Sequence, residues 1–97
     1  MQPFFVYILK CADGSYYTGH TDNIEARISA HKLGIIKQCY TYKLRPVELV
    51  YAETFGTRYE ALSAERRIKG WSRRKKMALI NGEYELLKYL SICKSKQ

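Results

Sequence analysis

Cysteine is scarce in this chain, and its few copies fit no pattern of metal-binding or disulfide-rich domains. The three thiols belong to Cys11, Cys39 and Cys93. Their odd number prevents complete disulfide pairing, and they show no metal-like spacing. We therefore expect reduced thiols, no disulfide partner and a cytoplasmic location.

Long apolar runs, repeats, linkers and low-complexity segments are missing as well. The apolar stretch Phe4–Leu9 lacks the basic flank and the cleavage site of a signal peptide. Nothing approaches the roughly 20 apolar residues of a membrane-spanning helix. The 97 residues suffice for one compact domain. We predict a single domain over 1–97, with a core of about 4–81 and a C-terminal helix over 83–93.

Acidic residues are the third shortage. There are 9 Asp and Glu against 17 Lys and Arg, which gives a formal net charge of +8. A positive field of this size concentrates polyanions near the surface. Nucleic acid is the first candidate partner, with DNA preferred and RNA possible, and an anionic membrane surface is the second. The alternative interpretation is that the charge only keeps the protein in solution.

The first half of the chain has the pattern of a β-hairpin followed by a helix. The apolar run Phe4–Cys11 predicts a buried strand, Asp13-Gly14 predicts a tight turn, and Ser15–Gly19 predicts a returning strand that ends at its glycine. A helix is then expected between Asp22 and Gly34. Its expected N-cap is Asp22, with Glu25 completing a capping box, and its expected apolar stripe is Ile24, Ile28 and Leu33.

The second half adds one strand and then helices. Gly34–Arg45 is expected to be a loop, and Val47–Thr54 the third strand. A capping box at Thr57–Glu60 predicts a helix to about Gly70, and Ser72 a short helix that ends at Asn81-Gly82. The order ββαβαα(α) predicts an α+β fold, in which a small, three-stranded and mainly antiparallel sheet is flanked by helices, with the first strand central.

Several reactive side chains recur around the predicted hairpin and first helix. Tyr7 and Tyr17 lie on strands joined by a tight turn, so they can approach each other across the sheet. Arg27 and His31 are four residues apart and share one helix face. Two phenols, a guanidinium and an imidazole can thus converge where the sheet meets the helix. Taken singly, each is equally typical of an ordinary strand, packing or surface residue.

Taken together, these residues resemble the GIY-YIG nuclease family, in its small stand-alone branch. The first family motif appears as Phe5-Val6-Tyr7 and the second as Tyr17-Thr18-Gly19. Gly19–Arg27 is similar to the family's glycine, helix start and arginine, and the surroundings of Glu65 are similar to its metal-binding helix. Both motifs depart from the family's pattern, because Phe5 and Val6 replace glycine and isoleucine in the first, and Thr18 replaces isoleucine in the second. None of these changes removes a reactive group.

The resemblance implies a role for each of these side chains. It implies Tyr7 as the general base, Tyr17 as a group that holds the water or a phosphate oxygen, and Arg27 as a phosphate ligand. His31 is expected either to orient Tyr7 or to accept its proton. A free tyrosine has a pKa near 10, so it is almost entirely protonated at pH 7. Lowering that pKa by about three units requires roughly 4 kcal/mol of preferential stabilisation of the phenolate. No single neighbour supplies that much.

The resemblance also implies one divalent metal ion, Mg²⁺ or Mn²⁺, with Glu65 as its ligand. Mg²⁺ commonly binds through one or two carboxylates, several waters and substrate phosphate. The alternative is that Glu65 only pairs with Lys69, four residues further on.

A dense basic run, Arg66–Lys76, predicts contact with backbone phosphates and binding that weakens steeply with salt. It contains no obvious base-reading element, so we expect little sequence specificity. His20 stands where some relatives carry a lysine, and Asn81 is either a phosphate contact or simply a helix-ending residue. The candidate nucleic-acid contacts are His20, Lys69, Arg73, Arg74, Lys75, Lys76 and Asn81.

The function expected from the sequence is a metal-dependent endonuclease that hydrolyses phosphodiester bonds in DNA during repair or processing. The alternative is a non-catalytic nucleic-acid-binding module that retains the same fold.

Overall fold

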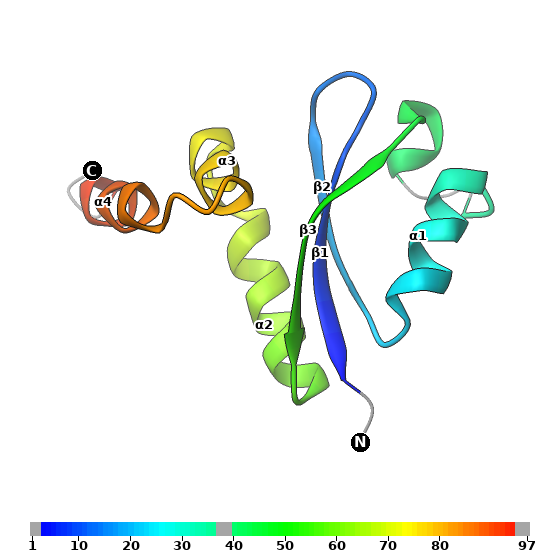
Figure 1. Cartoon of the computed structure of the whole chain (residues 1–97), viewed down its shortest axis with the longest axis horizontal. Coiled ribbons are helices and arrows are strands. Elements are labelled where there is room, and N and C mark those ends of the chain that lie inside the picture. The colour runs from blue at the N-terminus through cyan, green and yellow to red at the C-terminus, as the bar shows by residue number, and fades with distance from the viewer. Residues whose placement is uncertain (1–2, 37–39, 95–97) are drawn as a thin grey trace.

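The computed structural model describes residues 3–36 and 40–94, with side chains described as far as Ser91. Three strands and four α-helices follow one another in the predicted order (Figure 1). None of the helices in the described ranges is long and apolar enough to cross a membrane. The elements are β1 (Phe4–Lys10), β2 (Tyr16–Thr21), α1 (Ile24–Leu33), the 3₁₀ helix η1 (Tyr40–Leu44), β3 (Glu48–Phe55), α2 (Arg58–Lys69), α3 (Arg73–Ile80) and α4 (Tyr84–Lys94).

The sheet has the order β2-β1-β3, and both of its strand pairs are antiparallel. The prediction of an α+β fold with the first strand in the centre is therefore confirmed. Helix α2 covers one face of the sheet, and α1 with η1 covers the other (Figure 1). Alternation along β1 divides the core accordingly. Val6 and Ile8 pack with the α2 side chains Ala61 and Ala64, whereas Tyr7 and Leu9 pack on the opposite face.

The hairpin between β1 and β2 turns where Asp13-Gly14 predicted it, but the loop is longer than two residues. The N–H of Gly14 donates to the Cys11 carbonyl, and the N–H of Cys11 donates to the Ser15 carbonyl. Gly14 has a φ of 87°, a conformation that costs a glycine little. The expectation that β2 ends at Gly19 is wrong, because the strand pairs with β1 as far as Thr21.

Helix α1 begins one residue later than predicted. Asn23, not Asp22, is the N-cap, and its side-chain oxygen accepts the N–H of Ala26 at 3.2 Å. Thr21 fixes this register because its hydroxyl oxygen accepts the N–H of Asn23. Leu33 is 70% exposed, so it is not part of the buried stripe that the sequence predicted.

The predicted C-terminal end of α1 and the predicted ends of α2 and α3 are confirmed, whereas α4 is shifted by one residue from the predicted range 83–93. Gly34 closes α1 in the left-handed conformation with a φ of 73°. Thr57 and Ser72 cap α2 and α3 by accepting the N–H groups of Glu60 and Lys75. Asn81 terminates α3, as the helix-ending interpretation expected.

The segment expected to be a loop between α1 and β3 contains η1. This 3₁₀ helix turns Thr41 into the interior, where it is 1% exposed. Short 3₁₀ helices have weak sequence signatures, which is why the polar composition of the segment predicted only a loop. Cys39, one of the thiols expected to be reduced, lies outside the described residues, whereas Cys11 is buried.

The core leaves one hydroxyl without a partner among the described residues, that of Thr18. Thr18 is 3% exposed on β2, opposite Ile8. Replacing it with the isosteric valine is expected to raise the free energy of unfolding by about 1 kcal/mol, because an unpaired buried hydroxyl forfeits its hydration. Chemical denaturation measures this change. The control Thr54→Val, at an exposed β3 position, is expected to be near neutral, and a destabilised Thr18→Val protein would contradict the assignment.

Candidate active site

Gly19 makes room for the hydroxyl of Tyr7. The two residues are paired across β1 and β2, and Tyr7 is fully buried. A Cβ atom at position 19 would lie 2.5 Å from the Tyr7 hydroxyl oxygen and 2.7 Å from its Cζ, closer than van der Waals contact allows. The glycine therefore sets where the Tyr7 phenol sits.

Substituting Gly19 with alanine is expected to destabilise the protein by roughly 1–3 kcal/mol, the usual cost of overfilling a packed core. The denaturant midpoint measures this loss. Gly70→Ala is the matched control, because a Cβ there has no neighbour closer than 3.6 Å and Gly70 has an ordinary right-handed helical backbone. Equal midpoints for the Gly19→Ala and Gly70→Ala proteins would show that the Tyr7 hydroxyl is not held against Gly19.

A buried hydrogen-bonded chain connects the sheet to α1 and η1. The hydroxyl of Tyr7 lies 2.9 Å from Nε2 of His31, and Nδ1 of His31 lies 2.9 Å from the hydroxyl of Thr41. Burial, and secondarily the positive charge of Arg27, lowers the pKa of His31 below its ordinary value. The imidazole is therefore neutral at pH 7, with one N–H and one lone pair. It donates to one hydroxyl and accepts from the other.

Tyr17 and Arg27 complete this cluster. The Tyr17 ring centroid is 6.4 Å from that of Tyr7 and 5.3 Å from that of His31. Tyr17 is only half-buried, so it is the phenol of the two that solvent reaches. Arg27 lies one turn before His31 on α1 and is exposed. Its guanidinium is close enough to act electrostatically on His31.

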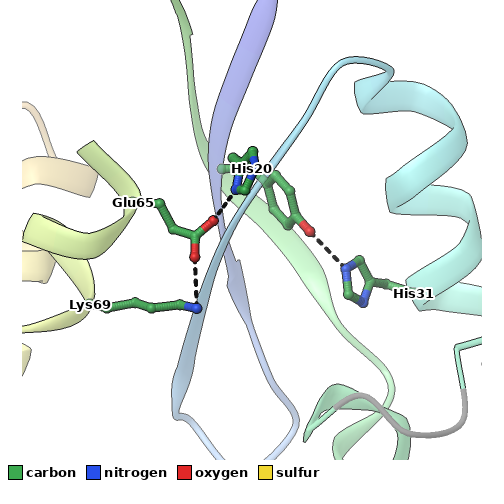
Figure 2. A network of polar contacts seen from close by, with 5 residues as sticks. His20, His31, Glu65 and Lys69 are labelled. Carbon is green, nitrogen blue, oxygen red and sulfur yellow. Dashed lines mark hydrogen bonds and ion pairs between the residues drawn. The ribbon is translucent and has the colours of Figure 1, made fainter. Parts of the chain in front are cut away.

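A second cluster, on the α2 face of the sheet, surrounds Glu65. Figure 2 shows the carboxylate between His20 of β2 and Lys69 of α2. His20 Nδ1 contacts one carboxylate oxygen, and Lys69 Nζ lies 2.7 Å from the other. Burial works to raise the pKa of Glu65, but hydrogen bonds from Lys69 and His20, with their charges, outweigh it and lower the pKa below its ordinary value. Glu65, 8% exposed, is therefore an ionised carboxylate.

The two clusters share β2, an edge strand of the sheet. His31 lies on one side of this strand, and Glu65 and Lys69 lie on the other (Figure 2). Lys69 links the two clusters, since its Nζ is 6.0 Å from the centroid of the Tyr17 ring. A substrate that lies along the open edge of β2 would meet both clusters.

The donor atoms around Glu65 suit a hard divalent cation that also binds substrate. The described residues contain no group of three or more His, Cys, Asp and Glu side chains able to hold a metal ion. One ionised carboxylate nevertheless suffices for a sparse site in which Mg²⁺ keeps several waters and uses substrate phosphate. Lys69, whose side chain is half-exposed, already neutralises this carboxylate. A cation at Glu65 would take over that role from the lysine.

The basic run that the sequence predicted is only partly a surface. Arg73 and Arg74 are exposed, and the Arg73 guanidinium lies over the Tyr16 ring at 5.1 Å. Lys75 departs from the expectation of an exposed phosphate contact. It is 7% exposed, and its ammonium lies 4.4 Å from the centroid of Trp71, because this face of α3 packs inward. Lys76 is half-buried, which lowers its pKa.

Two contacts in the site were not anticipated from the sequence. Thr41, as the partner of His31, had no signal, because it lies in a segment without a regular period. The contact between His20 and Glu65 did have a signal in the sequence, namely the alternation of side chains along a strand. Side chains two residues apart on a strand share a face, so His20 lies on the same face as Thr18 and points toward α2. Asn81 is exposed at the end of α3.

The chain belongs to the GIY-YIG family, a superfamily of nucleases: the model of the GIY-YIG catalytic domain matches residues 3–78. It is similar to the UPF0213 protein of Staphylococcus saprophyticus, with 49% identity over 84% of this chain and 98% of that protein. A UPF0213 protein of Staphylococcus aureus is 48% identical over 82% of this chain and 96% of its own length.

Two solved structures have the same fold. The solution structure of a UPF0213 protein from Bacillus halodurans is 40% identical, with a TM-score of 0.54 over 81% of this chain and 83% of that one. That of a protein from E. faecalis is 34% identical, with a TM-score of 0.59 over 87% and 88% of the two chains. The resemblance drawn from the two tyrosine motifs is thereby confirmed.

Proposed function

We propose that this protein is a metal-dependent endonuclease that hydrolyses phosphodiester bonds in DNA, in repair or processing, with little sequence specificity. The observation that carries the proposal is the pairing, across one edge strand, of a Tyr7–His31 hydrogen bond with the ionised carboxylate of Glu65. Phosphodiester hydrolysis needs a base for the attacking water and positive charge around the phosphoryl oxygens. The two clusters offer these on either side of β2.

Tyr7 is the general base in this proposal, and His31 is its proton acceptor. As Tyr7 takes a proton from a water held beside the half-exposed Tyr17, its own hydroxyl proton passes to Nε2 of His31, 2.9 Å away. This requires the tautomer in which Nδ1–H donates to Thr41. Because burial and Arg27 disfavour the imidazolium, His31 returns its proton to Tyr7 as Tyr7 releases one to solvent, which restores both groups.

Tyr17 and Arg27 contact the substrate. Tyr17 is half-exposed and its ring centroid lies 6.4 Å from that of Tyr7, which supports a role in which its hydroxyl holds the water or a phosphate oxygen. Arg27 presents its fork of N–H donors to phosphate oxygens, whose charge increases as the bond breaks.

Glu65 would hold the divalent metal, Mg²⁺ or Mn²⁺, with His20 beside it. When bound, the ion supplies Lewis-acid stabilisation of negative charge on the phosphate and on the departing oxygen. Lys69, freed from Glu65, lies between the carboxylate and Tyr17 and can bind a phosphate.

The exposed cations of the basic run Arg66–Lys76 hold the nucleic-acid backbone without reading its sequence. They are Arg66, Arg67, Lys69, Arg73 and Arg74. Contacts of this type position the substrate and weaken with salt.

The test is cleavage of labelled duplex, single-stranded, flapped and nicked DNA, and of RNA, by pure protein in Mg²⁺, Mn²⁺ or EDTA. Cutting that requires the metal supports the proposal. Binding without cutting on every substrate would overturn it in favour of a non-catalytic nucleic-acid-binding module.

A further inference from the structure

Tyr40 is an exposed aromatic residue that lies directly against the site. Its ring stacks on that of Tyr17, with centroids 6.4 Å apart and planes 20° apart. Tyr40 is nevertheless 56% exposed, so much of the ring that does not face Tyr17 is open to solvent. The ring centroids of Tyr17 and His31 are 5.3 Å apart. Only the Tyr17 ring therefore separates Tyr40 from the proposed general base Tyr7 and its proton acceptor His31.

The 3₁₀ geometry of η1 explains why Tyr40 points outward. Residues three apart share a face of such a helix. Thr41 is buried and Leu44 half-buried on the inner face, where Leu44 packs against the core. Tyr40 and Lys43 are both exposed on another face. An exposed aromatic ring and an exposed cation therefore lie on the same face of η1.

The Tyr40 ring is also held in place. Its hydroxyl donates to the hydroxyl oxygen of Ser15, 3.2 Å away in the β1–β2 hairpin. The contacts with Tyr17 and Ser15 fix the ring from two elements. An exposed aromatic ring held in this way loses little side-chain entropy when a ligand binds.

We propose that Tyr40 is a stacking platform for an unpaired base of the DNA substrate. Every base has a π-face that stacks on an aromatic side chain, but within a continuous duplex both faces of each base are already covered by neighbours. The platform therefore selects DNA that carries a single-stranded extension beside the bond to be cut. This inference rests on the proposed endonuclease function and names its substrate class.

The experiment compares binding of a blunt duplex with binding of the same duplex carrying a three-nucleotide overhang. Fluorescence anisotropy in EDTA at fixed salt gives both affinities without cleavage. Wild-type protein is expected to prefer the overhang by on the order of tenfold. Tyr40→Leu, which keeps an apolar side chain over Tyr17, is expected to abolish that preference, and Tyr40→Phe to retain it. A 2-aminopurine base in the overhang is expected to be quenched by wild type and by Tyr40→Phe only.

The matched control is Tyr59→Leu, which removes a tyrosine that is 79% exposed in the first turn of α2. It is expected to leave the preference unchanged. The inference is overturned if wild type does not prefer the overhang, if Tyr40→Leu keeps the preference, or if Tyr59→Leu loses it equally. If the wild-type protein prefers the overhang but never cuts DNA, the endonuclease function is overturned and the stacking role of Tyr40 is retained.

Discussion

Replacing Glu65 by alanine is expected to lower the Mg²⁺-dependent cleavage rate by about a thousandfold or more, since a catalytic metal supplies several kcal/mol of charge stabilisation. DNA affinity in EDTA is expected to stay the same or to rise slightly, because the change removes one negative charge from a basic surface. Single-turnover cleavage and anisotropy measure the two quantities separately. Loss of cleavage with retained binding supports Glu65 as the metal-holding residue.

Glu60→Ala is the control for this substitution. Glu60 lies on the same helix but is exposed, and it interacts with Thr57 at the N-terminal cap. It is therefore expected to retain cleavage. Because removing Glu65 leaves Lys69 and His20 without their shared carboxylate, thermal unfolding of both variants accompanies the assay. A folded Glu65→Ala protein that cuts DNA at the wild-type rate would rule out the metal role.

Tyr7→Phe is expected to lower the cleavage rate by about a hundredfold to ten thousandfold, the range that a positioned general base contributes. The ring stays in its buried position, but the hydroxyl that would take the proton of water is lost. Losing the hydrogen bond to His31 also costs about 1 kcal/mol of stability, so the rate is measured well below the unfolding temperature.

The matched control for this second change is Tyr51→Phe. Tyr51 lies on β3 opposite Ile8, so it faces the other side of the sheet, and its hydroxyl donates to Glu53. Its loss is expected to leave cleavage intact. If the Tyr7→Phe protein cuts as fast as wild type, the buried phenol has a structural role and the base must be sought elsewhere in the cluster.

Sequence patterns predicted the order of elements well because the signals were local and strong. Glycines and capping residues fixed most helix ends, and the apolar run of β1 is typical of a central strand. The errors arose where two local signals competed. Asp22 and Asn23 are both good N-caps, and the hydroxyl of Thr21 decided between them. Gly19 predicts the end of a strand, whereas in the structure it lies within β2 and leaves room for the Tyr7 ring on β1.

The candidate site was predictable only in part. Helical spacing correctly placed Arg27 and His31 on one face of α1, and the hairpin brought Tyr7 near Tyr17. The position of Glu65 relative to these residues depends on how α2 packs on the sheet, which local patterns do not encode. The burial of Lys75 has the same cause, since the inward face of α3 is set by its tertiary contacts.

The alternation along β2 has a consequence for how this sequence can change. Tyr17 and Gly19 face one side of the sheet, and Thr18 and His20 face the other. The site therefore depends on the alternation of these four consecutive residues. The antiparallel pairing of β2 with β1 holds this register. A single residue inserted between Tyr17 and His20 would exchange the two faces. It would carry His20 away from Glu65, although no residue of the site had been substituted.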